Sequence, residues 1–228
     1  MSKYLVKLKE SMKNLRKKNP FSVFRILNKE VSGKVLDLGC GKNSPIQYCK
    51  KVRFSVGVDI DKKAILESKE KGIHNSYIIK DIKKGLNFKK RSFDCVLLLD
   101  VIEHLPKRNG FKLLDLAKQI AKKKIIVYTP NGFMKQLEGL EKSSIYQKHL
   151  SGWSYDEMKK LGFSKIYGIN GWKYLNNIKF KIVKYFLQDL SSFLFIFIPK
   201  YSFQILCVKH IENSRYMKKR YEVILFEL

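Results

Sequence analysis

The sequence predicts an α/β fold built on a doubly wound, mostly parallel sheet. After Gly33, short apolar runs alternate with helical, lysine-rich stretches. Buried parallel strands are continuous apolar runs, and their alternation with helices implies right-handed crossovers. The length of 228 residues suits one sizeable core, because chains divide into domains beyond roughly 250 residues. With 45% hydrophobic residues, the chain can bury enough apolar surface to offset the entropy of ordering.

The apolar runs and the intervening stretches predict the elements in order. The first five strands are predicted at residues 34–39, 54–59, 76–80, 93–100 and 124–129, and helices at about 43–51, 62–71 and 107–122. A helix at 154–162, opened by a capping-box signature of Ser154 and Glu157, precedes strands at 163–169 and 203–210. Residues 3–29 predict one or two basic amphipathic helices, interrupted near Pro20.

The formal net charge of +27 would attract polyanions such as nucleic acid, anionic lipid or acidic substrates. The alternative is a general excess of lysine, because the charge is spread from Lys3 to Lys219 without an arginine-rich cluster. The four cysteines show no CxxC spacing, which predicts a reducing cytoplasm and no zinc site. The N-terminus has no secretory signal pattern, and no apolar run reaches the roughly 18 residues of a membrane span.

Two motifs predict a ribose-containing ligand. In "VLDLGCGKNSP", an apolar strand delivers Asp37, and Gly39 and Gly41 allow a tight turn with close approach of a ligand. In "VGVDID", Asp59 ends the second strand about 20 residues later, where an acid can bind both hydroxyls of a ribose. The spacing is not GxGxxG and no GK[ST] follows, so neither a dinucleotide nor a nucleoside triphosphate is favoured.

Four segments in order, "VLDLGCG", "VGVDID", "FDCVLLLDVIEHL" and "IIVYTPNG", resemble the class I S-adenosylmethionine-dependent methyltransferases. The resemblance covers about residues 31–168 and is nearest to the branch with the ubiquinone and menaquinone biosynthesis methyltransferases. It implies a seven-stranded Rossmann-like sheet whose last strand is antiparallel, and S-adenosylmethionine as cofactor. We therefore expect an N-terminal helical cap over 1–30, a methyltransferase domain over 31–210 with a helical insertion at 170–199, and a C-terminal extension over 211–228.

The resemblance also implies the cofactor-binding residues. They are Asp37, Gly39, Cys40 and Gly41 around the methionine part, Asp59 on the ribose with Ile60 on adenine, Asp81 on the adenine amino group with Ile82 beside it, and Leu99 and Asp100 along the methionine tail. Asp37 would reach the ammonium through water. For Asp81, a helix cap or a solvated turn is the alternative.

Catalytic candidates lie outside the cofactor motifs. In "DVIEHL", Asp100, Glu103 and His104 share a face if residues 100–105 begin a helix. Quinone-pathway O-methyltransferases have a similar acid-x-x-Glu-His pattern that binds a divalent metal, but Asp100 has a shorter reach than the usual Glu, and we predict no metal. Glu103 and His104 would then act in catalysis or only orient the loop under the cofactor.

His149, in "YQKHLSGWSYDEM", is the second catalytic candidate, because a histidine near neutral pKa suits a general base. The alternative is a loop histidine that caps backbone groups. Tyr146 and Trp153 nearby would line the acceptor pocket or simply pack.

The predicted insertion at 170–199 mixes aromatic residues and lysines with the apolar run 193–198. Basic amphipathic helices lie on anionic membranes, so a peripheral contact at the inner membrane face is one expectation. Covering an apolar acceptor pocket, or extending the core, are the alternatives.

The expected function is methyl transfer to a small or lipid-linked acceptor, with O-methylation favoured. The sulfonium is already activated, so the enzyme mainly positions the reactants, and a base is needed only for an acceptor that must lose a proton. An RNA or protein methyltransferase is the alternative, but there is no separate RNA-binding module, and "LLLDVIEH" lacks the Pro-Pro-Tyr type signature of amino-directed enzymes. A non-catalytic cofactor-binding subunit is the third possibility; the intact glycine and acid motifs argue against it.

Overall fold

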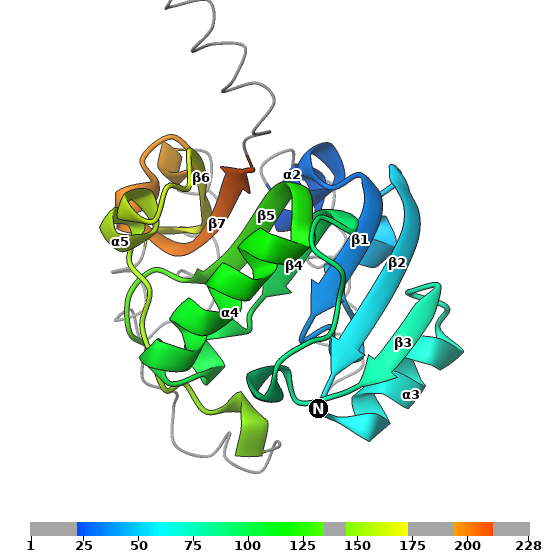
Figure 1. Ribbon diagram of the computed structural model, residues 1–228. Helices are drawn as coiled ribbons and strands as arrows, with labels where there is room; N and C mark the ends of the chain where they lie inside the picture. Colours follow the sequence, from blue (N-terminus) through cyan, green and yellow to red (C-terminus); the bar gives the residue numbers. More distant parts are fainter. Residues whose placement is uncertain (1–21, 135–144, 173–193, 212–228) are drawn as a thin grey trace, which may run out of the picture.

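The computed structural model describes residues 22–134, 145–172 and 194–211. Its seven strands form one sheet in the order β3-β2-β1-β4-β5-β7-β6 (Figure 1). The strands are β1 (Gly33–Leu38), β2 (Val52–Asp59), β3 (Ser76–Ile79), β4 (Phe93–Leu99), β5 (Ala121–Pro130), β6 (Lys165–Trp172) and β7 (Ser202–His210). The strands from β1 to β5 pair in parallel, and β7 runs antiparallel to both β5 and β6. The predicted fold is confirmed, including its antiparallel last strand.

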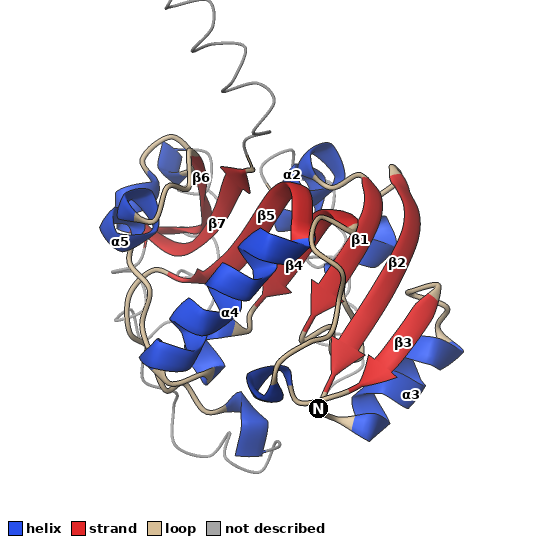
Figure 2. Ribbon diagram, in the orientation of Figure 1, coloured by secondary structure: helices blue, strands red, loops and turns tan. Residues whose placement is uncertain are grey.

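Helices flank this sheet on both faces (Figure 2). The α-helices are α2 (Val23–Glu30), α3 (Lys62–Glu70), α4 (Lys107–Ile120) and α5 (Tyr155–Lys160), and the 3-10 turns are η1 (Pro45–Tyr48), η2 (Ile82–Lys84), η3 (Ile102–His104), η5 (Ile145–Gln147) and η7 (Pro199–Tyr201). At α5, the Ser154 hydroxyl accepts from the Glu157 N–H as predicted, but the Glu157 carboxylate binds Lys107 instead of closing the capping box. The helix predicted at 43–51 is only the short turn η1.

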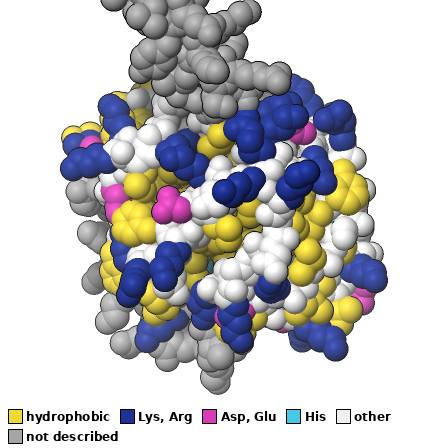
Figure 3. All heavy atoms as spheres, viewed as in Figure 1, with side chains coloured by type: hydrophobic (Ala, Val, Ile, Leu, Met, Phe, Trp, Pro, Cys, Tyr) yellow, Lys and Arg dark blue, Asp and Glu magenta, His cyan; other side chains and the backbone are white. Residues whose placement is uncertain are grey.

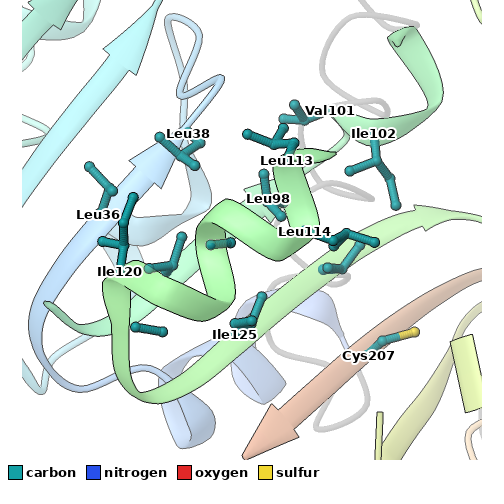
Figure 4. Close-up of a cluster of buried hydrophobic side chains, with 14 of the residues drawn as sticks. Leu36, Leu38, Leu98, Val101, Ile102, Leu113, Leu114, Ile120, Ile125 and Cys207 are labelled. Carbon is teal, nitrogen blue, oxygen red and sulfur yellow. The ribbon is translucent and has the colours of Figure 1, made fainter. Parts of the chain in front are cut away.

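The core has two layers, one on each face of the sheet. On one face, α4 packs Leu113, Leu114 and Ala117 against Leu36 and Leu98 (Figure 4). On the other face, Ile26 and Leu27 of α2 pack with alternate residues of the same strands, such as Leu97 and Ile126. Because successive strand residues point to opposite faces, one apolar run supplies both layers.

The buried carboxylate of Glu30 binds the end of α2 to strands β5 and β6. Glu30 is 3% exposed; its Oε2 lies 2.9 Å from Lys124 Nζ on β5, and its Oε1 accepts from the Tyr167 hydroxyl on β6 at 2.9 Å. Burial alone would raise the pKa of Glu30, but Lys124 and Tyr167 together hold it below its ordinary value. The described helix of the predicted 1–30 cap is therefore bound to the sheet through a charged pair.

The chain returns to the sheet after the predicted insertion by crossing Gly168 of β6. A Cβ at Gly168 would overlap the carbonyl oxygen of Phe195, so only glycine permits this close approach. The larger part of the insertion, the helices predicted before residue 22 and the extension after 211 lie outside the described residues.

Lysine and arginine side chains are scattered over the visible face, with hydrophobic side chains between them (Figure 3). On this face the positive charge is therefore dispersed, as it is along the sequence, and does not form a single basic stripe. Within the described ranges, no helix has both the length and the apolar character to cross a membrane.

Candidate functional site

The strand order brings the predicted cofactor residues to one edge of the sheet. β3, β2, β1 and β4 are neighbours, and their carboxyl ends carry Asp81, Asp59, the 37–41 loop and Asp100 respectively. In open α/β sheets, ligands bind at this edge. Residues up to 63 positions apart in sequence (37 to 100) are thus gathered at one place.

The glycine loop after β1 is held by backbone contacts. Gly39 and Gly41 have φ values of 71° and 54°, in the region that favours glycine. The N–H groups of Gly39 and Cys40 donate to the Val58 carbonyl at 2.7 and 3.1 Å. A Cβ at Gly39 would lie 2.6 Å from a Val101 methyl group, whereas one at Gly41 would meet nothing within 4 Å. The loop therefore packs closely against the segment after β4.

Asp59 joins the two motifs that predicted a ribose site. Its Oδ2 accepts from the Gly41 N–H at 2.8 Å, and its Oδ1 accepts from the Asp61 N–H at 2.9 Å. The carboxylate is half-buried beside half-buried Ile60. Two backbone donors orient it at the rim of the glycine loop.

Asp37 lies in a buried polar cluster that the sequence reasoning missed. Its Oδ2 accepts from the Ser44 hydroxyl at 2.5 Å and lies 3.0 Å from His74 Nε2, and all three residues are at most 6% exposed. Ser44 follows the glycine loop, so its hydroxyl could have been foreseen; no local pattern marks His74. The neighbouring Cys40 is buried, and this burial raises the pKa of its thiol, so it stays neutral. The water-mediated role predicted for Asp37 stays a prediction.

Asp81 is the N-cap of η2. Its Oδ1 accepts from the Lys83 N–H at 2.9 Å, and its Oδ2 lies 3.9 Å from Lys83 Nζ. These are the contacts of the helix-cap alternative. Ile82 packs against the larger core cluster, and the adenine contacts of both residues stay predictions.

The segment after β4 departs from the expected helix. Asp100 has a φ of 54°, a left-handed conformation that is uncommon outside glycine, and only residues 102–104 form a turn. The shared helical face is thus wrong, because a helix cannot include Asp100. The Glu103 and Asp100 carboxyl groups nevertheless form a hydrogen bond.

Glu103 is a buried acid in this segment. It is 2% exposed, and its Oε2 accepts from the Thr129 hydroxyl at 3.1 Å. Burial and, secondly, the charge of Asp100 raise the pKa of Glu103 above its ordinary value. Burial also raises the pKa of Asp100, to about 7, and we assign the proton shared by the pair to Glu103, whose side chain is the less exposed of the two.

Backbone hydrogen bonds place His149 beside this segment. The N–H groups of Leu150 and Ser151 donate to the Glu103 carbonyl at 2.7 and 3.0 Å, which brings the loop before α5 onto η3. The rings of His104 and His149 lie 5.0 Å apart between centroids.

The hydrogen bonds of both histidines indicate the same tautomer. His104 Nδ1 is 3.3 Å from the Lys148 carbonyl, and His149 Nδ1 is 2.8 Å from the Met134 carbonyl. Since a carbonyl only accepts, each Nδ1 carries a proton, and the Nε2 of a neutral ring keeps its lone pair. Burial, followed by the nearby His149, lowers the pKa of His104 despite its backbone hydrogen bond to Lys148.

Glu103, His104 and His149, which are the three predicted catalytic residues, form one cluster. One ligand-type atom from each lies within 4.8 Å of the others. A neutral imidazole can act as a proton acceptor, and two imidazoles with an acid that loses its proton also suit a divalent transition metal. These three side chains could thus serve as metal ligands, although the sequence predicted no metal. His149 takes the place that Asp100 has in the acid-x-x-Glu-His pattern.

The sequence was compared with protein families and with curated proteins to find which reaction its relatives carry out. Residues 36–126 match the family described as a methyltransferase domain. None of the curated proteins matches the sequence. Residues 36–126 therefore lie in a methyltransferase domain, which agrees with the class I S-adenosylmethionine-dependent methyltransferase that the sequence predicts.

Three solved structures show the range of relatives with the fold of this methyltransferase. A SAM-dependent methyltransferase from Archaeoglobus fulgidus is 20% identical with a TM-score of 0.53, over 86% of this chain and 98% of that one. The small RNA methyltransferase HEN1 is 16% identical with a TM-score of 0.55, over 89% of this chain and 25% of that one. A phosphoethanolamine N-methyltransferase from Haemonchus contortus, in complex with S-adenosylhomocysteine, is 16% identical with a TM-score of 0.50, over 83% of this chain and 52% of that one. These likenesses show the fold, and the quinone-biosynthesis branch stays a prediction.

At the ends of β4, β5, β6 and β7, the methyltransferase has a hydrogen-bond network that the sequence did not reveal. The Tyr128 hydroxyl donates to Gln204 Oε1 at 2.5 Å, Asn170 Nδ2 also donates to Gln204 Oε1, and Gln204 Nε2 donates to Asp100 Oδ1 at 3.4 Å. These residues come from β4, β5, β6 and β7 or their ends, so the network crosses half of the sheet. Asn170 shares the positive φ of Asp100, at 61°.

Asn131, in the "TPNG" motif after β5, fastens the end of the insertion to the methyltransferase. Its Nδ2 lies within 3.2 Å of the carbonyl oxygens of Pro199, Lys200 and Ser202, and its Oδ1 accepts from the Tyr155 N–H of α5. Trp153 is wholly buried and packs in the core, while Tyr146 is 46% exposed.

Proposed function

We propose that this methyltransferase transfers a methyl group to a hydroxyl oxygen of a small or lipid-linked acceptor. The supporting observation is the cluster of Glu103, His104 and His149, in which His149 donates its Nδ1–H to the Met134 carbonyl, so that the Nε2 of the neutral ring keeps its lone pair. A hydroxyl must lose its proton on methylation, and a neutral imidazole can accept it. S-adenosylmethionine would supply the methyl group, its sulfur would keep the electron pair of the broken bond, and His149 Nε2 would accept the proton that the acceptor hydroxyl loses.

The cofactor is proposed to lie across the carboxyl ends of β1, β2, β3 and β4. Asp59 would bind the ribose hydroxyls, because its carboxylate is oriented beside the glycine loop. Asp37 and the 39–41 loop would border the methionine part, with Leu99 and Asp100 along its tail, and Asp81 and Ile82 beside the adenine. Support for this arrangement comes from the strand order, which gathers all these residues at one edge.

A divalent cation at the same cluster is consistent with the donor set. Glu103, His104 and His149 would hold it, and a bound cation would lower the pKa of an acceptor hydroxyl. His149 would then be a ligand, and the base would come from elsewhere. The two arrangements differ in their response to chelation.

The test is methyl transfer from S-adenosylmethionine to a panel of catechol, phenol and amine acceptors, with and without a chelator. We expect turnover on a hydroxyl acceptor and a loss of at least about 100-fold in His149→Ala, while cofactor affinity stays unchanged. Lys148→Ala is the matched control, because Lys148 is exposed in the same loop and contacts His104 through its backbone carbonyl. Activity confined to amines, or full activity of His149→Ala, would overturn the proposal; cofactor binding without any turnover would favour a non-catalytic subunit.

RNA methylation is the second candidate, favoured by the +27 charge and by the structural likeness to a small RNA methyltransferase. The dispersed charge weakens it, since RNA-binding surfaces usually cluster their cations. Short single-stranded RNA in the same assay separates the two candidates.

A peripheral membrane contact through 170–199 is also proposed, together with a cytoplasmic location. Support comes from the described end of this segment, where Leu194, Phe197 and Ile198 are 58, 72 and 49% exposed. Flotation with anionic vesicles tests it, and recovery of all the protein in the vesicle-free fraction would contradict it.

A further inference from the structure

A cavity of about 610 Å³ lies at the β6 edge of the sheet. Its walls include residues of α2, of α5, of the first half of β6 and of segment 196–199. β6 is the outermost strand, and the cavity takes residues from both core layers. It therefore spans the edge of the sheet.

This cavity is separate from the cofactor edge. In the sheet order, β6 lies four strands from β1, which carries the glycine loop. At about 4.8 Å between neighbouring strands, the lateral separation is about 19 Å. None of the predicted cofactor or catalytic residues is among the described wall residues.

Apolar side chains make up much of the wall. Phe163 is 3% exposed at the base, and half-buried Ile166 and Ile196 lie nearby. Phe197 is 72% exposed at the rim, although it lies beside a cavity that could bury its ring. Pockets of this size and character bind the apolar part of a ligand.

Three cations complete the wall, namely Arg25, Lys29 and Lys159. They are exposed, and within the described ranges none of them forms an ion pair with an acid. By contrast, Lys124 and Lys165 form ion pairs with Glu30, and Lys200 forms one with Asp156. The cavity thus combines an apolar interior with unneutralised positive charge.

We propose that this cavity is a second ligand site, which binds an aliphatic chain that carries a phosphate group. The chain lies on Phe163, Ile166 and Phe197, and the phosphate binds Arg25 and Lys159. Phosphate and guanidinium or ammonium groups form charge-assisted hydrogen bonds, and the apolar wall distinguishes an alkyl phosphate from inorganic phosphate. The inference does not depend on the proposed acceptor.

The ligand could be a free amphipathic phosphate or the headgroup end of an anionic phospholipid in a membrane. Two probes separate these sources: n-octyl phosphate below its micelle concentration, measured by titration calorimetry, and vesicles of phosphatidylglycerol or phosphatidylcholine, measured by flotation. Binding of monomeric octyl phosphate identifies a free ligand. Binding only to phosphatidylglycerol vesicles identifies a lipid headgroup.

The variant Arg25→Glu/Lys159→Glu tests the site in the full chain. We expect it to bind the recognised probe at least about tenfold more weakly, because each lysine or arginine near an anionic group contributes about fivefold. Lys69→Glu/Lys112→Glu changes the net charge equally at exposed positions of α3 and α4 and should bind as the wild type does. Phe197→Ser should also weaken octyl phosphate binding but leave the weak binding of inorganic phosphate unchanged.

S-adenosylmethionine affinity and the unfolding midpoint, measured for every variant, show that each is folded and that the cofactor edge is intact. Two results overturn the proposal. One is that neither octyl phosphate nor phosphatidylglycerol vesicles bind better than inorganic phosphate and phosphatidylcholine. The other is that both double variants lose binding equally, which would assign it to net charge alone.

Discussion

The carboxyl groups at the ends of β1, β2 and β3 differ in their hydrogen bonds from those after β4. On the first side, the proposed donor side, Asp37, Asp59 and Asp81 each accept hydrogen bonds, from a side-chain hydroxyl or from backbone N–H groups. After β4, where the proposed donor and acceptor would meet, Asp100 and Glu103 hydrogen-bond each other, and Glu103 is buried. The donor-side carboxyl groups are thus oriented by hydrogen-bond donors, whereas the pair after β4 shares a proton.

The largest effect should come from removing the best-oriented donor-side anion. Asp59→Ala deletes the proposed ribose contacts and leaves the Gly41 and Asp61 N–H groups without their acceptor. We expect S-adenosylmethionine binding to weaken by at least about 100-fold, since hydrogen bonds to charged groups contribute roughly 1.5 to 3 kcal/mol each. Titration calorimetry measures this, and an unchanged affinity would remove Asp59 from the cofactor site.

Glu30, away from the edge, is the reference for a buried and fully paired carboxylate. Glu30→Gln should lower the free energy of unfolding by about 2 kcal/mol at pH 7, because it removes the charge facing Lys124. Since the folded-state pKa of Glu30 is below the ordinary 4.5, its contribution is present above that value and is lost as the pH falls through the lowered pKa. Urea denaturation at pH 7 and pH 3 should therefore show a smaller difference between wild type and variant at pH 3.

The contact between the two sides can be tested at the glycine loop. In Gly39→Ala, the new Cβ meets Val101 and the backbone is strained, so we expect a loss of about 2 kcal/mol in stability and weaker cofactor binding. Gly41→Ala is the matched control: it carries only the backbone strain of about 1 kcal/mol. Equal losses in the two variants would show that the close packing on Val101 has no consequence.

The smallest effect should be at Glu103. Glu103→Gln replaces a protonated acid with a neutral amide of the same shape, so stability should change by less than about 1 kcal/mol at pH 7. A loss as large as that of Glu30→Gln would mean that Glu103 is ionised, and the distinction between the two sides would fail. Thermal unfolding of both variants under one condition decides this.

The fold was predictable because its signal is local. A strand that is buried on both faces is a continuous apolar run. The strand predicted at residues 93–100, for example, is β4 (Phe93–Leu99), which ends one residue earlier. The site was predictable only where a motif lies at a strand end, as with Asp59. The contact of His74 with Asp37 and the network of Tyr128, Asn170 and Gln204 join segments 34 to 76 residues apart, and no periodicity encodes such pairs.

Local reasoning was also wrong where tertiary contacts decide the backbone. The i, i+3, i+4 spacing favoured a helix from Asp100, but Asp100 adopts a left-handed conformation in which its carboxylate reaches Gln204. Glu103 and His104 still meet His149, because backbone hydrogen bonds dock its loop on Glu103. The sequence therefore predicted Glu103, His104 and His149 as separate catalytic candidates, but it did not predict that they lie together.

The Asn131 side chain fixes where the chain enters β7, and Gly168 fixes where Phe195 crosses β6. β7 is therefore held between β5 and β6 by contacts that lie outside its own ladder of hydrogen bonds. Substitution of Asn131 or Gly168 should act first on this half of the sheet, because the ends of β1, β2 and β3 keep their own contacts.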